Sequence, residues 1–108
     1  MERHFEHELE RLASMVQRLG GLVENAIGNS VRALTERDGD LARRTIGEDE
    51  SVDQLELEVD AFTLELLARY QLAARDLRFV TTAMKMAEDL ERMADHAVNV
   101  CERALELN

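Results

Sequence analysis

Acidic side chains recur at helical spacing in the last third of this 108-residue chain. The stretch 87–102 reads AEDLERMADHAVNVCE, and one polar row within it comprises Glu88, Glu91, Asp95, Asn99 and Glu102. At about 100° per residue, these five side chains fall within an arc of roughly 80° on one helix face. Like charges one turn apart destabilise a helix. The row therefore indicates that something positive neutralises it.

A second acidic row lies earlier in the chain, in a predicted helix over 41–70. It comprises Asp49, Asp53, Glu56 and Asp60. These side chains fall within an arc of about 60°. If the two helices are antiparallel neighbours, the start of one meets the end of the other. We then expect the two aspartates at the start of this row to face Glu91 and Asp95 across a shallow groove.

The ligand atoms of such a groove determine which cations it accepts. Carboxylates with the amide of Asn99 beside them favour hard cations, namely Mg²⁺, Ca²⁺, Mn²⁺ or iron, over metals that prefer thiolates. His96 follows Asp95 in the chain and therefore points about 100° away from it. Spacing alone leaves a second interpretation open, in which both rows are solvated helix faces.

Three apolar seams predict the helices that carry these rows. The first, in 2–36, runs through Phe5, Leu9, Leu12, Val16, Leu19, Val23, Ala26 and Ser30, and is widened by Leu22, Ile27, Val31 and Leu34. The second, in 41–70, runs through Thr45, Val52, Leu55, Val59, Phe62 and Leu66. The third, in 74–107, is dominated by small residues and runs through Val80, Ala83, Ala87, Leu90, Ala94, Ala97, Cys101 and Ala104. We expect four methionines to fill the core or its margin: Met15, Met84, Met86 and Met93.

Two breaks separate the predicted helices. Residues 37–40 contain Asp38-Gly39, a turn signal, and Asp38 or Asp40 is suited to cap the next helix. Residues 71–76 contain neither Gly nor Pro, so this break rests on the change of periodicity and on Asp76 as a cap or first-turn acid. Short connections make the helices run up, down and up, and none can bury its seam alone. The sequence therefore predicts an all-α fold, an antiparallel three-helix bundle.

Gly20 and Gly21 interrupt the first seam. One interpretation is a weak point or slight kink, which costs about 1 kcal/mol per glycine. The other is a close approach between two helices. We favour the weak point.

Composition limits the classes of function. A net charge of −10 argues against nucleic acid, whose phosphates need Lys and Arg, and against docking on anionic lipid. The one cysteine cannot form an internal disulfide and fits a reducing cytoplasm. The sequence contains no apolar run long enough to span a membrane, and its acidic N-terminus is unlike a signal peptide.

An enzymatic role has no supporting set of residues. Di-iron carboxylate bundles need Glu-x-x-His, and no histidine here has a glutamate three residues before it. The sequence also contains no Gly-rich phosphate loop, nucleophile elbow or Cys–His pair. We therefore expect no enzyme, and two classes remain: a cation-binding protein, or an acidic interaction module whose partner is basic.

The sequence resembles the PhoU family of bacterial phosphate-signalling regulators over essentially all of its length. The resemblance rests on the opening HFEHELERL, on GEDESVDQLELEVD, and most specifically on the segment 74–102 with its core DLERMADHAVN. It implies a PhoU-type or spectrin-like three-helix bundle. Family members usually carry two such bundles in tandem, so the resemblance implies that residues 1–108 are one bundle of the pair.

The resemblance also implies a metal site. The family is known for an E/D-x-x-x-D motif that binds multinuclear metal clusters on the bundle surface. This sequence matches the motif at 91–95 and at 49–53. The implied ligands are Asp49, Asp53, Glu91 and Asp95, with the weaker candidates Glu56, Asn99 and Glu102 on the same edges. The implied cofactors are divalent or ferric ions such as iron, Mn²⁺ or Mg²⁺.

The role implied by the resemblance is that of a cytoplasmic adaptor. Such an adaptor represses the phosphate-starvation response when phosphate is plentiful, and it acts through the sensor histidine kinase and the ATPase subunit of the phosphate transporter. Family members are about twice this length. We expect an isolated half, a truncated chain, or a one-bundle protein that forms a homodimer to rebuild the pair.

Overall fold

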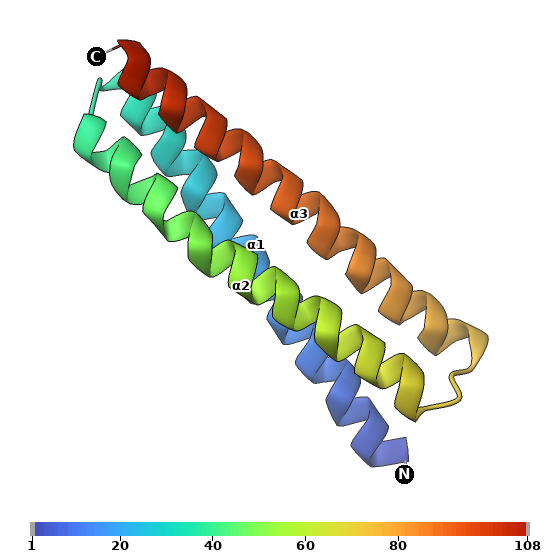
Figure 1. Ribbon diagram of the computed structural model, residues 1–108. Coiled ribbons are helices and arrows are strands. Elements are labelled where there is room, and N and C mark those ends of the chain that lie inside the picture. Colours follow the sequence, from blue (N-terminus) through green and yellow to red (C-terminus); the bar gives the residue numbers. More distant parts are fainter. Residues whose placement is uncertain (1, 108) are drawn as a thin grey trace.

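Three long α-helices make up the structure, a computed structural model that describes the backbone of residues 2–107 and the side chains of residues 4–107. α1 spans Glu2–Thr35, α2 spans Gly39–Arg69 and α3 spans Ala74–Leu107. They lie side by side in a bundle with extents of 56 × 17 × 17 Å (Figure 1). None of the three helices, as described, has the length of apolar sequence needed to cross a membrane.

The helices run up, down and up, and each packs against both others (Figure 1). This confirms the predicted antiparallel three-helix bundle. The helix boundaries also agree with the predicted ones to within two residues. The predicted domain includes Met1 and Asn108, which lie outside the described residues.

Arg37 and Asp38 build the turn between α1 and α2. Arg37 adopts a left-handed φ of 53°, and the Asp38 N–H donates to the Ala33 carbonyl over 2.9 Å, which closes the end of α1. The Asp38 carboxylate then accepts a hydrogen bond of 3.0 Å from the Leu41 N–H and caps α2. Of the two predicted caps, Asp38 is the one used, and Asp40 lies in the first turn of α2.

The connection between α2 and α3 lies where the helix ranges 41–70 and 74–107 predicted it. Tyr70 takes an extended conformation with φ −121° and ψ 143°, and its N–H donates to the Leu66 carbonyl, so α2 ends there. α3 begins at Ala74, as predicted, within the break signalled by residues 71–76. Asp76 lies in the first turn of α3, where an acidic side chain interacts favourably with the helix dipole.

Apolar side chains from all three helices fill the centre of the bundle. The main cluster comprises Leu12, Val16, Leu19, Val23, Val52, Leu55, Val59, Phe62, Leu66, Val80, Ala83, Ala87 and Ala94. A second cluster near the first turn comprises Ala33, Leu41, Ala42, Cys101 and Ala104. Three buried hydroxyl groups donate to carbonyls of their own helices over 2.7–2.8 Å, namely those of Ser30, Thr45 and Thr63. The core is therefore aliphatic and rich in alanine along α3, as the seams predicted.

The predicted seams are wrong at their margins. Val31 and Leu34 are 51% and 39% exposed, and Ala33 faces the core between them. Met86 and Met93 are 49% and 44% exposed, although we expected them in the core or at its margin. Each of these methionines lies about 100° from the buried alanine that follows it. That angle places both side chains on a flank of α3 that no neighbouring helix covers.

Gly20 and Gly21 do not mark a close approach within this bundle. No atom lies within 4 Å of the position that a Cβ would take at either residue. The glycines are therefore better interpreted as weak points of α1 than as a packing device.

Candidate metal centre

The acidic groups are positioned by the buried residues that precede them in the chain. Val52 of α2 and Ala94 of α3 belong to the same core cluster. The next residues, Asp53 and Asp95, lie about 100° further round their helices, at the edge of the α2–α3 contact. Asp49 precedes Asp53 by one turn and lies on the same edge. Because α2 and α3 are antiparallel, the two acidic rows converge there.

Three aspartates meet at this edge. Oxygen atoms of Asp49, Asp53 and Asp95 all lie within 4.8 Å of one another. Asp49 is half-buried, and the other two side chains are exposed. Oxygen ligands sit about 2.0–2.6 Å from Mg²⁺ or Ca²⁺, so ligands on opposite sides of one ion are roughly 4–5 Å apart. The three carboxylates therefore fit around a hard cation, and they are the residues that would hold it.

Glu91 adjoins this group through Asp95. A side-chain hydrogen bond with Asp95 raises the pKa of Glu91 to about 7, with further contributions from partial burial and from the charges of Asp95, Asp53 and Glu56. Near neutral pH the Glu91 carboxyl is therefore protonated part of the time, and that proton is donated toward Asp95. Such a proton lies where a cation would otherwise supply the positive charge.

The same crowding affects two acids of the α2 row, Asp49 and Glu56. Partial burial, followed by the charges of Asp53 and Asp95, raises the pKa of Asp49. Partial burial, followed by the charges of Asp60, Asp53 and Glu88, raises the pKa of Glu56. Every shift has the sign expected of carboxylates that lie too close together without a counter-ion.

The predicted site residues differ in how close they lie to this group. Asp49, Asp53 and Asp95 are together, Glu91 is hydrogen-bonded to one of them, and Glu56 interacts with Glu91 through its charge. Asn99 is exposed one turn beyond Asp95. Glu102 is exposed a further turn away and, among the described residues, is not part of the three-aspartate group.

Glu88 is a contributor that sequence reasoning placed in the acidic row but did not select as a site residue. Its charge is one of the causes that raise the pKa of Glu56. The sequence signal that could have identified it is its position three residues before Glu91, on the same edge of α3.

Cys101 does not add a thiolate to the site. The side chain is fully buried, and burial raises the pKa of its thiol above the usual range, against a smaller opposite effect of a hydrogen bond with Thr45. The thiol therefore stays protonated at neutral pH. The candidate site is built from oxygen ligands alone, which is the ligand set of a hard cation.

Fold and site together define a helical-bundle protein with an acidic surface at the junction of its second and third helices. Residues 16–104 match the family model described as the PhoU domain. The chain belongs to the PhoU family, which is a family of accessory proteins and not of enzymes.

Three relatives illustrate the similarity. A PhoU homolog of the phosphate-specific transport system from Pseudomonas putida is 38% identical over 107 residues, which is 99% of this chain and 42% of the relative. The accessory protein PhoU of Escherichia coli (strain K12) is 36% identical over 102 residues, 94% of this chain and 42% of the relative. PhoU homolog 1 of Thermotoga maritima is 32% identical over 105 residues, 97% of this chain and 45% of the relative. The chain thus spans less than half the length of these relatives, and no solved structure matches it.

Proposed function

We propose that this chain is a metal-binding regulatory adaptor in phosphate uptake and phosphate-starvation signalling. The observation that carries the proposal is the meeting of Asp49, Asp53 and Asp95 within 4.8 Å. The family supplies the cellular context, because the relatives are named accessory proteins of the phosphate-specific transport system.

The bound species is a divalent or ferric ion, or a small cluster of such ions. Three aspartates with Glu91 beside them offer more negative charge than one divalent ion neutralises, which favours a trivalent ion or more than one metal. Glu56 extends the acidic surface along α2, and Asn99 and Glu102 extend it along α3. Iron, Mn²⁺ and Mg²⁺ suit this oxygen ligand set.

The adaptor acts in the cytoplasm as a negative regulator. Its proposed partners are the phosphate-sensing histidine kinase and the ATPase subunit of the phosphate transporter. Metal binding would neutralise the acidic edge of α2 and α3. It would thereby change the charge that this edge presents to either partner.

Thermal unfolding with and without metal tests the site. Protein stripped with a chelator is melted alone and with Mg²⁺, Mn²⁺ or Fe³⁺, and the metal content of untreated protein is measured by elemental analysis. A ligand that binds only the folded state raises stability by about 2.7 kcal/mol at a hundred times its Kd. We expect a higher Tm with at least one metal, and no such gain when Asp53, Glu91 and Asp95 are all replaced by alanine.

Glu50 provides the matched control. It neighbours Asp49 in sequence and is exposed, but it lies on the flank of α2 that faces α1 and is not part of the three-aspartate group. Glu50→Gln removes one acidic charge and should keep the full metal-dependent gain. Coincident melting curves of the wild-type protein with and without all three metals would refute the metal site.

A second candidate function is an acidic interaction module without a metal. The net charge of −10 and the exposed carboxylates of Asp53 and Asp95 favour it. This alternative predicts that a basic partner binds more weakly as salt is added, and that a chelator changes neither the binding nor the Tm.

A further inference from the structure

The outward side of α2 carries a short row of exposed apolar side chains, which we call the outer seam. It comprises Leu57, Ala61, Leu64 and Ala68. Each member follows a buried residue of α2 by two positions and therefore lies about 200° round the helix, nearly opposite the core. Leu57 and Leu64 are 60% and 56% exposed, and of the large apolar side chains that the structure describes only Leu107 is more exposed. Packing within the bundle therefore does not account for this row.

The spacing of the outer seam is that of a coiled coil. Its members are separated by four, three and four residues, which is the heptad pattern by which one helix packs along another. Glu50 and Gln54 occupy the same two heptad positions one heptad earlier and are polar, so the seam begins at Leu57. A single exposed leucine needs no explanation, but an aligned series indicates a surface that accepts a helix.

Carboxylates line both edges of the outer seam. Glu58 and Glu65 directly follow the two leucines and lie on the edge toward α1, where Glu58 lines a hollow together with α1 residues. Asp53 and Asp60 are seven residues apart on the edge toward α3, and Asp53 meets Asp95 of α3 there. These four positions correspond to the e and g positions of a coiled coil, whose charges select the partner helix.

Arginines of the bundle neutralise this rim only in part. Arg69 pairs with Glu65 over 3.4 Å, and Arg11 and Arg18 share the hollow that Glu58 lines. Exposed ion pairs of this kind are weak and exchange readily. The four carboxylates also outnumber the three arginines, so the rim remains net negative, as is the whole chain at −10.

We propose that the outer seam binds an amphipathic helix of another protein, one whose apolar side is bordered by Lys or Arg. The apolar row supplies the contact area, and the carboxylates on both edges attract basic borders. A second copy of this chain does not fit, because joining two outer seams places carboxylates opposite carboxylates whichever way the helices run. An anionic lipid surface is repelled in the same way. The proposal goes beyond both candidate functions, since it specifies the surface and the helical shape of the partner, and it stands whether or not a metal binds.

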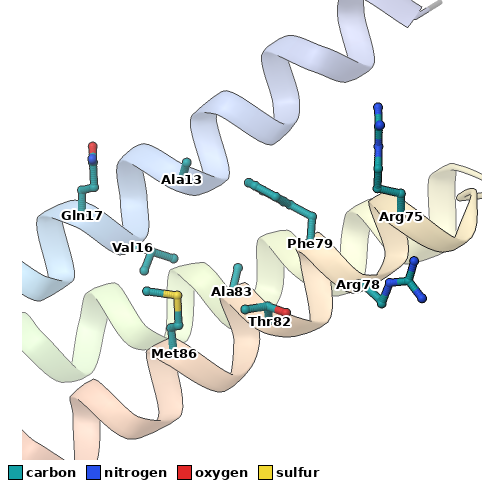
Figure 2. A pocket seen from close by; sticks show the side chains of 9 residues that line it. All are labelled: Ala13, Val16, Gln17, Arg75, Arg78, Phe79, Thr82, Ala83 and Met86. Carbon is teal, nitrogen blue, oxygen red and sulfur yellow. The ribbon is translucent and has the colours of Figure 1, made fainter.

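A second exposed apolar surface has charges of the opposite sign. It is an open groove of about 500 Å³ between α1 and α3, where Phe79 and Met86 extend from α3 toward α1 with Ala83 between them (Figure 2). The charged side chains in its lining are Arg75 and Arg78. These arginines repel a basic helix, so charge distinguishes the two surfaces and the groove provides a control.

Binding of a designed peptide tests the outer seam. The probe is a fluorescent helical peptide of about three heptads with leucine at positions a and d and lysine at e and g, where the lysines also keep the peptide from pairing with itself. Anisotropy follows its binding to the 108-residue chain in a chelating buffer, so the result does not depend on metal. We expect saturable binding that weakens as NaCl rises from about 50 mM to about 500 mM. Amide signals of an isotope-labelled chain should shift chiefly within residues 57–68.

Two matched variants separate the outer seam from general attraction to an acidic protein. Leu57→Gln/Leu64→Gln keeps every charge and should weaken peptide binding by at least about tenfold, because two buried leucines are lost from the contact. Phe79→Gln/Met86→Gln makes the same change at two exposed groove residues with the same spacing, and should bind the peptide as the wild-type chain does. Circular dichroism establishes that both variants remain helical.

A scrambled peptide of the same composition, which cannot form an apolar seam, should bind at least about tenfold more weakly than the designed one. The proposal is overturned if the designed peptide does not bind, if the scrambled peptide binds equally well, or if the leucine variant binds as tightly as the wild-type chain. Equal loss of binding in the groove variant would also overturn it. Sedimentation velocity adds one more such outcome, because a change of mass in the leucine variant would assign the outer seam to a contact between copies.

Discussion

Replacing Asp95 by asparagine should stabilise the metal-free protein and abolish its response to metal. Asp95 is the only member of the three-aspartate group supplied by α3, so its charge repels two carboxylates of α2 across the helix contact. Asparagine keeps the size of the side chain and can still hydrogen-bond to Glu91. The substitution therefore removes the repulsion without opening the α2–α3 edge.

The size of this gain in stability follows from the distances between the carboxylate oxygens of the three aspartates. Two unit charges 4.8 Å apart repel by about 0.9 kcal/mol in a medium as polar as water. This is the appropriate limit because Asp53 and Asp95 are exposed. Removing two such pairs gives about 2 kcal/mol at low ionic strength, and added salt reduces the gain. For a chain of this size the Tm should rise by roughly 5–10 °C.

Differential scanning calorimetry in a chelating buffer at neutral pH measures this gain. The same scan with saturating Mn²⁺ should raise the Tm of the wild-type protein, and it should leave Asp95→Asn almost unchanged because one of three ligand carboxylates is missing. Asp95→Asn should therefore have the higher Tm without metal, and the metal should raise only the Tm of the wild-type protein. If Asp95→Asn melts below the wild-type protein without metal, or no differently from Glu50→Gln, the aspartates are not crowded as the structure describes.

Three further predictions concern titration and packing. The pKa of Glu91 is about 7 in the folded protein and 4.5 ordinarily, so the folded state binds more protons than the unfolded state between these pH values. The free energy of unfolding of the metal-free protein should therefore fall as pH rises from 4.5 to 7. Urea unfolding across this range checks it, and Glu91→Gln should flatten the curve. Gly21→Ala should raise the free energy of unfolding by about 1 kcal/mol, seen as a higher urea midpoint at unchanged m-value, because the new Cβ meets open space. Ala94→Leu should lower it by about 1–3 kcal/mol in the same assay, because the alanine is 1% exposed where α3 packs against its neighbours.

The fold was predictable because all three helical segments carry the same kind of sequence pattern. An unbroken apolar period without proline specifies each helix, and the Asp38-Gly39 turn specifies where the first reversal occurs. The second connection was predicted in the right place but from weaker sequence signals. No glycine or proline marks it, and α2 ends only because Tyr70 takes an extended conformation. Such a conformation depends on the surrounding packing rather than on the preference of tyrosine alone.

Periodicity gives the direction of a helix's buried face but not the width of that face. The width depends on how closely the neighbouring helices approach. α3 has a seam of small residues, which allows close contact along a narrow line, and Met86 lies just outside it. The sequence pattern therefore placed Met86 with the core, and the structure leaves it in the open groove between α1 and α3.

The candidate site shows a second limit of periodicity, which does not determine how far one helix is shifted lengthwise against its neighbour. Antiparallel packing was enough to predict that the rows of α2 and α3 converge, and Asp49, Asp53 and Asp95 do meet. Which acidic residues of the two rows meet depends on the lengthwise register of α2 against α3. A periodic sequence constrains that register only weakly. This is why Glu102, in the same row as Asp95, lies outside the group although the pattern treats the two alike.

The two flanks of α3 now have different chemical characters on either side of one buried seam. Glu91 and Asp95 lie on the flank toward α2, and Phe79 and Met86 lie on the flank toward α1. A helix that served only to complete a three-helix core would need neither feature, since crowded carboxylates and exposed apolar surface both lower the stability or solubility of an isolated bundle. Each feature becomes favourable once its complement is bound, a cation on one flank and apolar surface on the other. The separation of the two flanks by the alanine seam means that both can be satisfied at once.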